Sequence, residues 1–193
     1  MSNFIFIKRN IDVSAVLAQL KEYESDWKEV STYESTGGTK DPYGFLPLVM
    51  ALTNAEFPMP KNTDLLQPTP MFERHTEIKK LVWSLGVKKF SRAAYFKLAV
   101  GGGIGNHIDD GTYYLNKDRY HLSLAGRYLY NVDGEEHIIE PGTFFWFDNK
   151  KYHWAKNIHP TDDRLTFVFD VPHSKDNPHH KVKNMFKTKA KKK

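Results

Sequence analysis

Three side chains in the second half of the chain have the types and spacing of a metal site. His107 and Asp109 are separated by one residue, and His153 follows further along the chain. Two imidazoles and one carboxylate bind iron on one face and leave the opposite coordination positions open for reactants. Arg164, the first arginine after His153, offers a planar guanidinium that can bind a carboxylate with two hydrogen bonds. These residues predict an iron site with His107, Asp109 and His153 as ligands and a small dicarboxylate as co-reactant.

A second polar cluster lies between the predicted metal ligands. Arg119, His121 and Ser123 alternate with apolar residues in a segment typical of a strand. Alternate residues of a strand point to the same side, so these three side chains share a face. If that face points inward, it supplies polar groups near the metal, and His121 stays open as an alternative third ligand. Taken singly, each of these residues could also be an ordinary surface or barrel-rim residue.

The apolar pattern divides the chain into a helical first part and a strand-rich second part. Apolar residues at helical spacing predict helices over 13–27 and 72–85. From residue 90 onward the period changes to two, and turn signals separate predicted strands at 93–100, 119–132, 135–140, 143–148 and 165–171. Short strands joined by tight turns predict a mainly β fold with flanking helices, namely a double-stranded β-helix or cupin-like jelly roll.

Two segments and a glycine cluster are predicted to be irregular. Residues 31–40 and 57–70 are rich in polar residues, Gly or Pro and are predicted loops. The glycines of 101–105 precede His107, but this cluster lacks the Lys-Ser/Thr ending of a phosphate-binding loop. We therefore expect it to form a sharp turn before the first metal ligand.

Composition limits the kinds of site and partner. The 193-residue chain has no cysteine, so a metal ion must be bound by His, Asp or Glu. The formal charge of +5 comes from the end of the chain, because residues 173–193 hold eight Lys and one Asp, whereas the remainder holds 20 Lys and Arg against 22 Asp and Glu. We expect one folded domain over 1–172 and a basic, disordered tail over 173–193. The tail could contact nucleic acid or another anionic surface weakly, but the near-neutral body argues against a dedicated nucleic-acid-binding protein.

No apolar stretch is long enough for a signal-peptide core or a membrane span. We therefore expect a cytoplasmic protein without a membrane partner.

The second half of the chain also resembles a known family. Four stretches are similar to the aspartyl/asparaginyl β-hydroxylase branch of the Fe(II)- and 2-oxoglutarate-dependent dioxygenases; they are 102–107 (GGIGNH), 119–124 (RYHLSL), 141–148 (PGTFFWFD) and 153–171, from His153 to Val171. The resemblance implies a double-stranded β-helix with His107 and His153 as metal ligands. It also implies that Arg164 binds the distal carboxylate of 2-oxoglutarate, and that Arg119 and His121 contact the other end of this cosubstrate.

Asp109 is where the chain departs from part of this family. Animal members that hydroxylate Asp or Asn in proteins have Gly at this position, whereas members with the full triad include cis-hydroxylases of free proline. The resemblance implies hydroxylation of an unactivated C–H bond with O2, Fe(II) and 2-oxoglutarate, and with ascorbate as an activator. The substrate would be an Asp, Asn or Pro residue in a peptide, or a free amino acid such as proline. The alternative is a cupin-like metal-binding isomerase or ligand-binding module without oxygenase activity, which would not need Arg164.

Overall fold

The computed structural model describes residues 2–30, 43–51 and 65–173. Their helical segments are α1 (Ser14–Glu22), η1 (Glu24–Asp26), α2 (Pro70–Arg74), α3 (Thr76–Ser84) and η2 (Thr112–Asn116). Their strands are β1 (Phe4–Lys8), β2 (Lys28–Val30), β3 (Tyr43–Ala51), β4 (Leu66–Pro68), β5 (Ala93–Leu98), β6 (Gly103–His107), β7 (Lys117–Ala125), β8 (Tyr128–Val132), β9 (Glu135–Ile139), β10 (Phe144–Phe147), β11 (His153–Asn157) and β12 (Arg164–Pro172). None of the described helices is long and apolar enough to cross a membrane.

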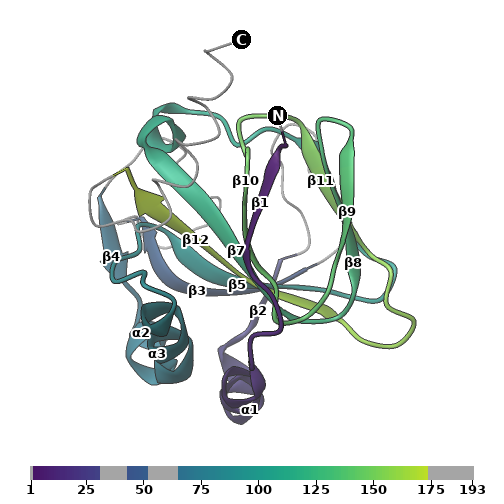
Figure 1. Ribbon diagram of the computed structural model, residues 1–193. Coiled ribbons are helices and arrows are strands. Elements are labelled where there is room, and N and C mark those ends of the chain that lie inside the picture. Colours follow the sequence, from purple (N-terminus) through teal and green to yellow (C-terminus); the bar gives the residue numbers. More distant parts are fainter. Residues whose placement is uncertain (1, 31–42, 52–64, 174–193) are drawn as a thin grey trace.

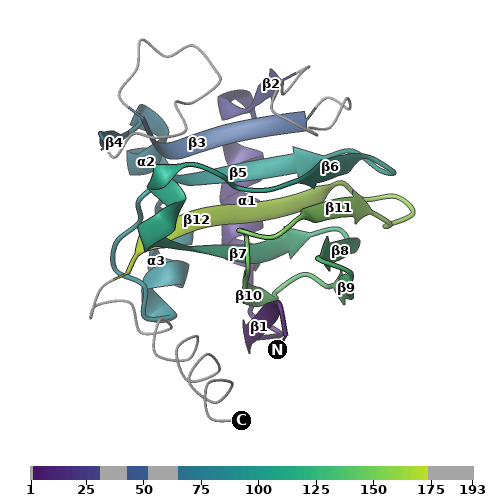
Figure 2. The ribbon, with the colours of Figure 1, turned by 90° about the horizontal axis from the view of Figure 1, so that it is seen from above.

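The strands form two antiparallel sheets that face each other (Figures 1 and 2). The larger sheet has the order β1-β10-β7-β12-β5-β3-β2, with β4 paired to β3, and the smaller has the order β6-β11-β8-β9. Two antiparallel sheets with non-sequential neighbours are the arrangement of a jelly roll. The predicted double-stranded β-helix with flanking helices is therefore confirmed.

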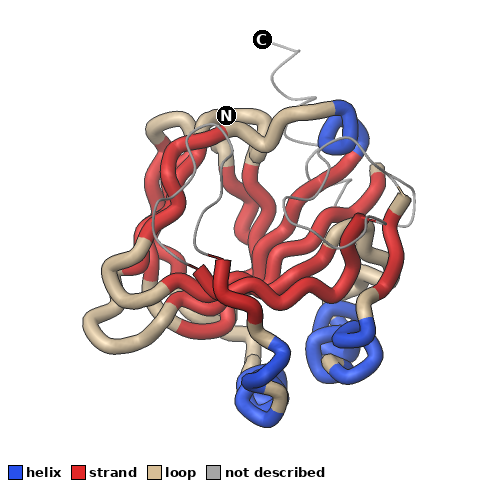
Figure 3. The backbone as a smooth tube through the Cα atoms, turned by 180° about the vertical axis from the view of Figure 1, so that it is seen from behind, coloured by secondary structure: helices blue, strands red, loops and turns tan. Residues whose placement is uncertain are grey.

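Strand β7 separates two apolar cores. Tyr120, Leu122 and Leu124 pack in the cluster that also holds Val16 of α1 and Val82 of α3, so this face of the larger sheet is covered by the helices, as Figure 3 shows. Arg119, His121 and Ser123 alternate with them and face the interior between the sheets. There the ring of His121 lies 4.9–5.5 Å from the rings of its aromatic neighbours Tyr130, Phe145 and Phe147.

Several predicted elements were too long. The helix predicted over 13–27 ends at Glu22, and the one predicted over 72–85 is divided at His75, whose ψ of 68° is not helical. The strand predicted over 119–132 is two strands, because Gly126 adopts a φ of +70° and turns the chain between β7 and β8.

The first part of the chain is less helical than predicted. It also contributes strands β1 to β4, of which β3 is central enough to pair with both β2 and β5. Strands β6 and β11 were not predicted either, since both are short and carry polar residues on both faces. The predicted loop at 31–40 lies outside the described residues, as does 57–64, whereas β4 and the start of α2 occupy the rest of the second predicted loop.

Candidate metal centre

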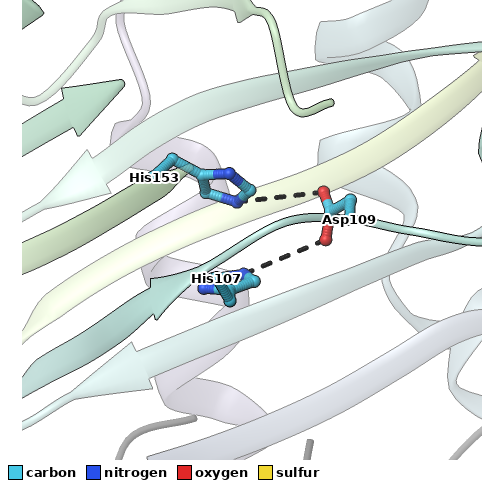
Figure 4. A group of neighbouring side chains, drawn as sticks. All are labelled: His107, Asp109 and His153. Atoms are coloured by element: carbon cyan, nitrogen blue, oxygen red, sulfur yellow. Dashed lines mark ion pairs between the residues drawn. The ribbon is translucent and has the colours of Figure 1, made fainter. Parts of the chain in front are cut away.

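The three predicted metal ligands meet at one point of the barrel. One nitrogen of His107, one of His153 and one carboxylate oxygen of Asp109 all lie within 4.8 Å of one another. Nε2 of His107 is 3.9 Å from Oδ1 of Asp109, and Nε2 of His153 is 4.0 Å from its Oδ2. Figure 4 shows the three side chains converging, with His107 and Asp109 from one stretch of the chain and His153 from another. Two imidazoles and a carboxylate at this spacing fit a divalent transition-metal ion.

Backbone carbonyl groups orient both imidazole rings. Nδ1 of His107 lies 2.8 Å from the carbonyl oxygen of Gly105, and Nδ1 of His153 lies 2.8 Å from that of Lys151. A carbonyl can only accept a hydrogen bond, so Nδ1 carries the proton in each ring. In a neutral ring the lone pair is then on Nε2, the nitrogen that faces Asp109, and this is the tautomer that a metal ligand needs.

The register of the smaller sheet places the two histidines together. His107 ends β6 and His153 begins β11, and they are direct cross-strand partners with ring centroids 4.2 Å apart. Asp109 follows β6, and its backbone N–H donates to the carbonyl of Asn149 at 3.0 Å. This hydrogen bond joins the segment after β6 to the turn before β11, so the carboxylate is held beside both rings.

The electrostatics keep Asp109 and His153 in the ligand form. Burial lowers the pKa of His153 to about 4, so the imidazole is neutral at pH 7. Burial alone would raise the pKa of Asp109, but Arg119 and the two histidines oppose this and lower it to about 2. At neutral pH the site therefore offers an ionised carboxylate and a neutral His153 to a cation.

Arg119 is bonded to carboxylates. Its Nη1 donates to Oδ2 of Asp109 at 2.8 Å, while Nε and Nη2 donate to the two oxygens of Asp170 at 2.8 and 2.9 Å. A further hydrogen bond of 3.2 Å joins Nη2 to the hydroxyl of Tyr114. The structure thus places Arg119 against the metal carboxylate, and its contact with a cosubstrate stays a prediction.

Arg164 is buried without a carboxylate among the described residues. It is 1% exposed, its guanidinium lies 4.3 Å from the ring centre of Tyr128, and its Nε and Nη1 have no hydrogen-bond partner in the described part of the chain. Buried charges are normally paired, because an unpaired one costs several kcal/mol. This arginine is therefore a fitting site for an anionic ligand.

Other polar atoms in the same interior also lack partners among the described residues. They are Nδ1 of His121, Oγ of Ser123, Oγ1 of Thr166 and the hydroxyl of Tyr128. Ser123 and Thr166 are cross-strand partners on β7 and β12. Burial is the main cause of the lowered pKa of His121, and the charge of Arg164 is the second cause. Buried polar groups rarely stay unsatisfied, so the set fits a ligand with several hydrogen-bonding oxygens, as a dicarboxylate has.

Some residues of this region were not singled out from the sequence. Asn149, whose Nδ2 donates to Oδ2 of Asp109 at 2.9 Å, carries no recognisable signal. Thr166 and Asp170 lie at even offsets from Arg164, so strand alternation places them on its face, although the sequence assigns neither of them a role. Tyr128 was not singled out because the turn at Gly126, which precedes it, was not predicted.

Comparison with protein-family models decides the family. The model described as aspartyl/asparaginyl beta-hydroxylase matches residues 12–174, which is most of the chain. The chain belongs to this family. It is accordingly an Fe(II)- and 2-oxoglutarate-dependent dioxygenase that acts as a hydroxylase, and the alternative of a cupin-like isomerase or binding module is not supported.

Solved structures agree with the fold. An oxidoreductase of the 2OG-Fe(II) oxygenase family from Burkholderia pseudomallei aligns with a TM-score of 0.55 and 11% identity, over 83% of this chain and 80% of that one. The structure of OsALKBH1 aligns with a TM-score of 0.55 and 12% identity, over 89% and 99% of the two chains. At these identities the likeness concerns the architecture alone. A search of curated proteins gave no match.

Proposed function

We propose that this hydroxylase acts on an unactivated C–H bond of an amino acid, with His107, Asp109 and His153 holding Fe(II) and Arg164 binding the distal carboxylate of 2-oxoglutarate. The observation that carries the proposal is that one barrel interior holds both a His-Asp-His cluster and a buried Arg164 that has no carboxylate partner among the described residues. Overall, the substrate C–H, O2 and 2-oxoglutarate would give the alcohol, succinate and CO2.

The side chains divide the work between binding and exclusion of water. When bound, Fe(II) and 2-oxoglutarate supply the oxidising chemistry with O2. Arg164, with the hydroxyl groups of Ser123 and Thr166, would orient the dicarboxylate through charge-assisted hydrogen bonds. The rings of Tyr130 and Phe147, which flank His153, form an apolar wall on that side of the site. Such a wall keeps water from the reacting atoms.

A free amino acid is the first candidate substrate, and its carboxylate needs a cationic partner near the site. Arg92, Lys97 and Arg127 are the candidate cations for that carboxylate, and of these Lys97 pairs with Glu24 and Arg127 pairs with Glu140 in partly exposed ion pairs. Arg92 instead is buried, and its Nη1 donates at 3.4 Å to the hydroxyl of Tyr114, which also accepts from Arg119. Arg92 thus belongs to the hydrogen-bond network of the metal carboxylate, and we propose it as the partner of a substrate carboxylate.

A peptide residue is the second candidate. The family description names aspartyl and asparaginyl substrates, so an Asp, Asn or Pro residue within a peptide remains an alternative. Asp109 supports the free amino acid, because it completes a triad that members acting on proline possess. Whichever substrate is used, we expect a cytoplasmic location. Any weak anionic contact of the basic tail concerns residues that lie almost entirely outside the described part of the chain.

Succinate formation tests the proposal. Protein would be incubated with Fe(II), ascorbate, O2 and 2-oxoglutarate, and separate pools of free amino acids and of Asp-, Asn- or Pro-containing peptides would be added. We expect free amino acids such as proline to stimulate succinate release, and His153→Ala to abolish it. If only the peptides stimulate succinate release, the substrate is a residue in a peptide and not a free amino acid. No succinate with either pool, together with no anaerobic absorption band on adding 2-oxoglutarate to the Fe(II) protein, would refute the proposed function.

A further inference from the structure

The two oxygens of the metal carboxylate have different surroundings. Oδ2 of Asp109 accepts hydrogen bonds from Nη1 of Arg119 at 2.8 Å and from Nδ2 of Asn149 at 2.9 Å. Nε2 of His153 lies 4.0 Å from this same Oδ2, whereas Oδ1 faces Nε2 of His107 at 3.9 Å. An oxygen that already accepts two hydrogen bonds has few lone-pair directions left, so Oδ1 is the oxygen better able to bind a metal ion.

Arg119 is itself held from behind by Asp170. The two residues are cross-strand partners on β7 and β12, and they form a bidentate ion pair. Asp170 is 0% exposed, and its Oδ2 also accepts from the hydroxyl of Tyr113 at 3.2 Å. A bidentate pair fixes the plane of the guanidinium, and this plane decides where Nη1 points.

Asp170 also sets the charge of the site. Without it, the positive charge of Arg119 would offset the negative charge of Asp109 and repel an incoming cation. With Asp170 present, the three side chains sum to one negative charge, which attracts a divalent ion. The same three groups therefore control both the direction and the charge of the metal carboxylate.

We propose that Asn149 and Asp170, the latter acting through Arg119, are positioning residues that hold Oδ2 of Asp109 and leave Oδ1 for the metal. This inference rests on the metal site of the proposed function. It differs from the role that the resemblance implies for Arg119, since the contact here is with a metal ligand and needs no cosubstrate.

Metal affinity without cosubstrate tests it. Co(II) alone, as an air-stable substitute for Fe(II), would be titrated into the full chain and its Kd measured calorimetrically for wild type, Asp170→Asn, Asn149→Ala and Arg119→Lys. We expect each variant to bind Co(II) at least about tenfold more weakly, as is usual when a group that orients a metal ligand is lost. Arg119→Lys keeps the charge but cannot bond both carboxylates in one plane. A loss of Co(II) affinity in this variant would therefore come from the geometry of the guanidinium and not from its charge.

Asp118→Asn is the matched control. Asp118 is equally buried on β7, but its partner is His173, with Nε2 3.3 Å from Oδ1. We expect it to lower the melting temperature while leaving the Kd for Co(II) unchanged. Asn149→Ala removes only one neutral hydrogen-bond donor. If Asp170→Asn fails to fold, the Co(II) affinity of Asn149→Ala still tests whether holding Oδ2 of Asp109 matters for the metal.

The outcomes separate this inference from the proposed function. Wild type that binds Co(II), with variants that bind it equally well or lose no more affinity than Asp118→Asn, would overturn the positioning role and leave the metal site standing. Wild type that does not bind Co(II) would overturn the metal site and the positioning role together.

Discussion

Two arginines of the barrel interior have opposite surroundings. Arg119 is bonded to Asp109 and Asp170, and its position is explained by the protein alone. Arg164 is more deeply buried, at 1% exposed against 16% for the side chain of Arg119, yet two of its nitrogens lack a partner among the described residues. An unpaired cation inside the fold lowers the stability of the ligand-free protein. A ligand that supplies the missing anion would remove this cost.

Replacing Arg164 should therefore separate stability from ligand binding. We expect Arg164→Met to weaken 2-oxoglutarate binding by about 30-fold or more, because losing one partner of a buried charge pair costs about 2–5 kcal/mol. The melting temperature of the ligand-free protein should not fall, since the substitution removes an unpaired buried charge. Anaerobic titration of 2-oxoglutarate into the Fe(II) protein, followed by the absorption band, measures the first effect, and thermal unfolding measures the second.

Arg127→Met is the control for that change. Arg127 is 49% exposed and pairs with Glu140 at 2.9 Å, so its loss should alter neither quantity appreciably. Unchanged 2-oxoglutarate affinity in Arg164→Met would show that another residue binds the distal carboxylate.

At the residue level, the sequence predicted the candidate metal ligands that the fold brings together, but little of what orients them. His107, Asp109 and His153 are recognisable because few residue types bind iron and their order along the chain is informative. The role of Asn149 in holding Asp109 depends on a turn whose shape no local pattern specifies. The paired state of Arg119 likewise depends on cross-strand register, which brings Asp170 beside it from about fifty positions away.

At the level of elements, the turn at Gly126 and the end of β11 determine the position of Arg164. A Cβ at Gly126, between β7 and β8, would lie 2.7 Å from the carbonyl oxygen of Asp163 and 2.8 Å from Cα of Arg164. Nearby, Asn157 at the end of β11 donates hydrogen bonds to the carbonyl groups of Leu98 and Asp162. These contacts fix the start of β12 from two sides.

Alternation predicted the strands of the second half other than β6 and β11, because each of these has one face on an apolar core. It did not predict the break at Gly126, since a single glycine does not interrupt the apolar pattern around it. Strand β1 was missed for a different reason: its run of apolar residues shows no period, and it becomes a strand by pairing with β10. Such tertiary pairing overrides local preference.

Gly126→Ala should disturb both the turn and the ligand site. The substitution places a methyl group against the backbone of Arg164 and in a φ of +70°. We expect a loss of about 2–4 kcal/mol in the free energy of unfolding and weaker 2-oxoglutarate binding, measured by urea denaturation and by anaerobic titration.

Gly134→Ala provides the comparison. Gly134 has a φ of +83°, but a Cβ there would meet nothing within 4 Å. This variant should show only the conformational strain, about 1 kcal/mol, and normal cosubstrate affinity. Equal effects of the two substitutions would mean that the contact with Arg164 is unimportant.

For the whole molecule, the notable charge feature is how many histidines are buried in the neutral form. Burial lowers the pKa of His75, His121 and His153 below the ordinary value of 6.5. His75 lies between α2 and α3, and the other two lie in the barrel interior. Composition gives the number of histidines, but only the fold shows which of them must stay uncharged.

These histidines make the stability of the metal-free protein depend on pH in a definite direction. An unfolded histidine titrates near 6.5, so below that pH the unfolded chain binds more protons than the folded one, and stability is lost as pH falls. For His153, whose folded pKa is about 4, lowering the pH from 7 to 5 should cost about 2 kcal/mol. His75 and His121 add to the loss in the same direction. Urea denaturation with a chelator present, at several pH values, measures it. In His153→Asn the loss of unfolding free energy between pH 7 and 5 should be smaller by the contribution of this one histidine. A wild-type stability that is constant between pH 7 and 5 would contradict the neutral state of these buried rings.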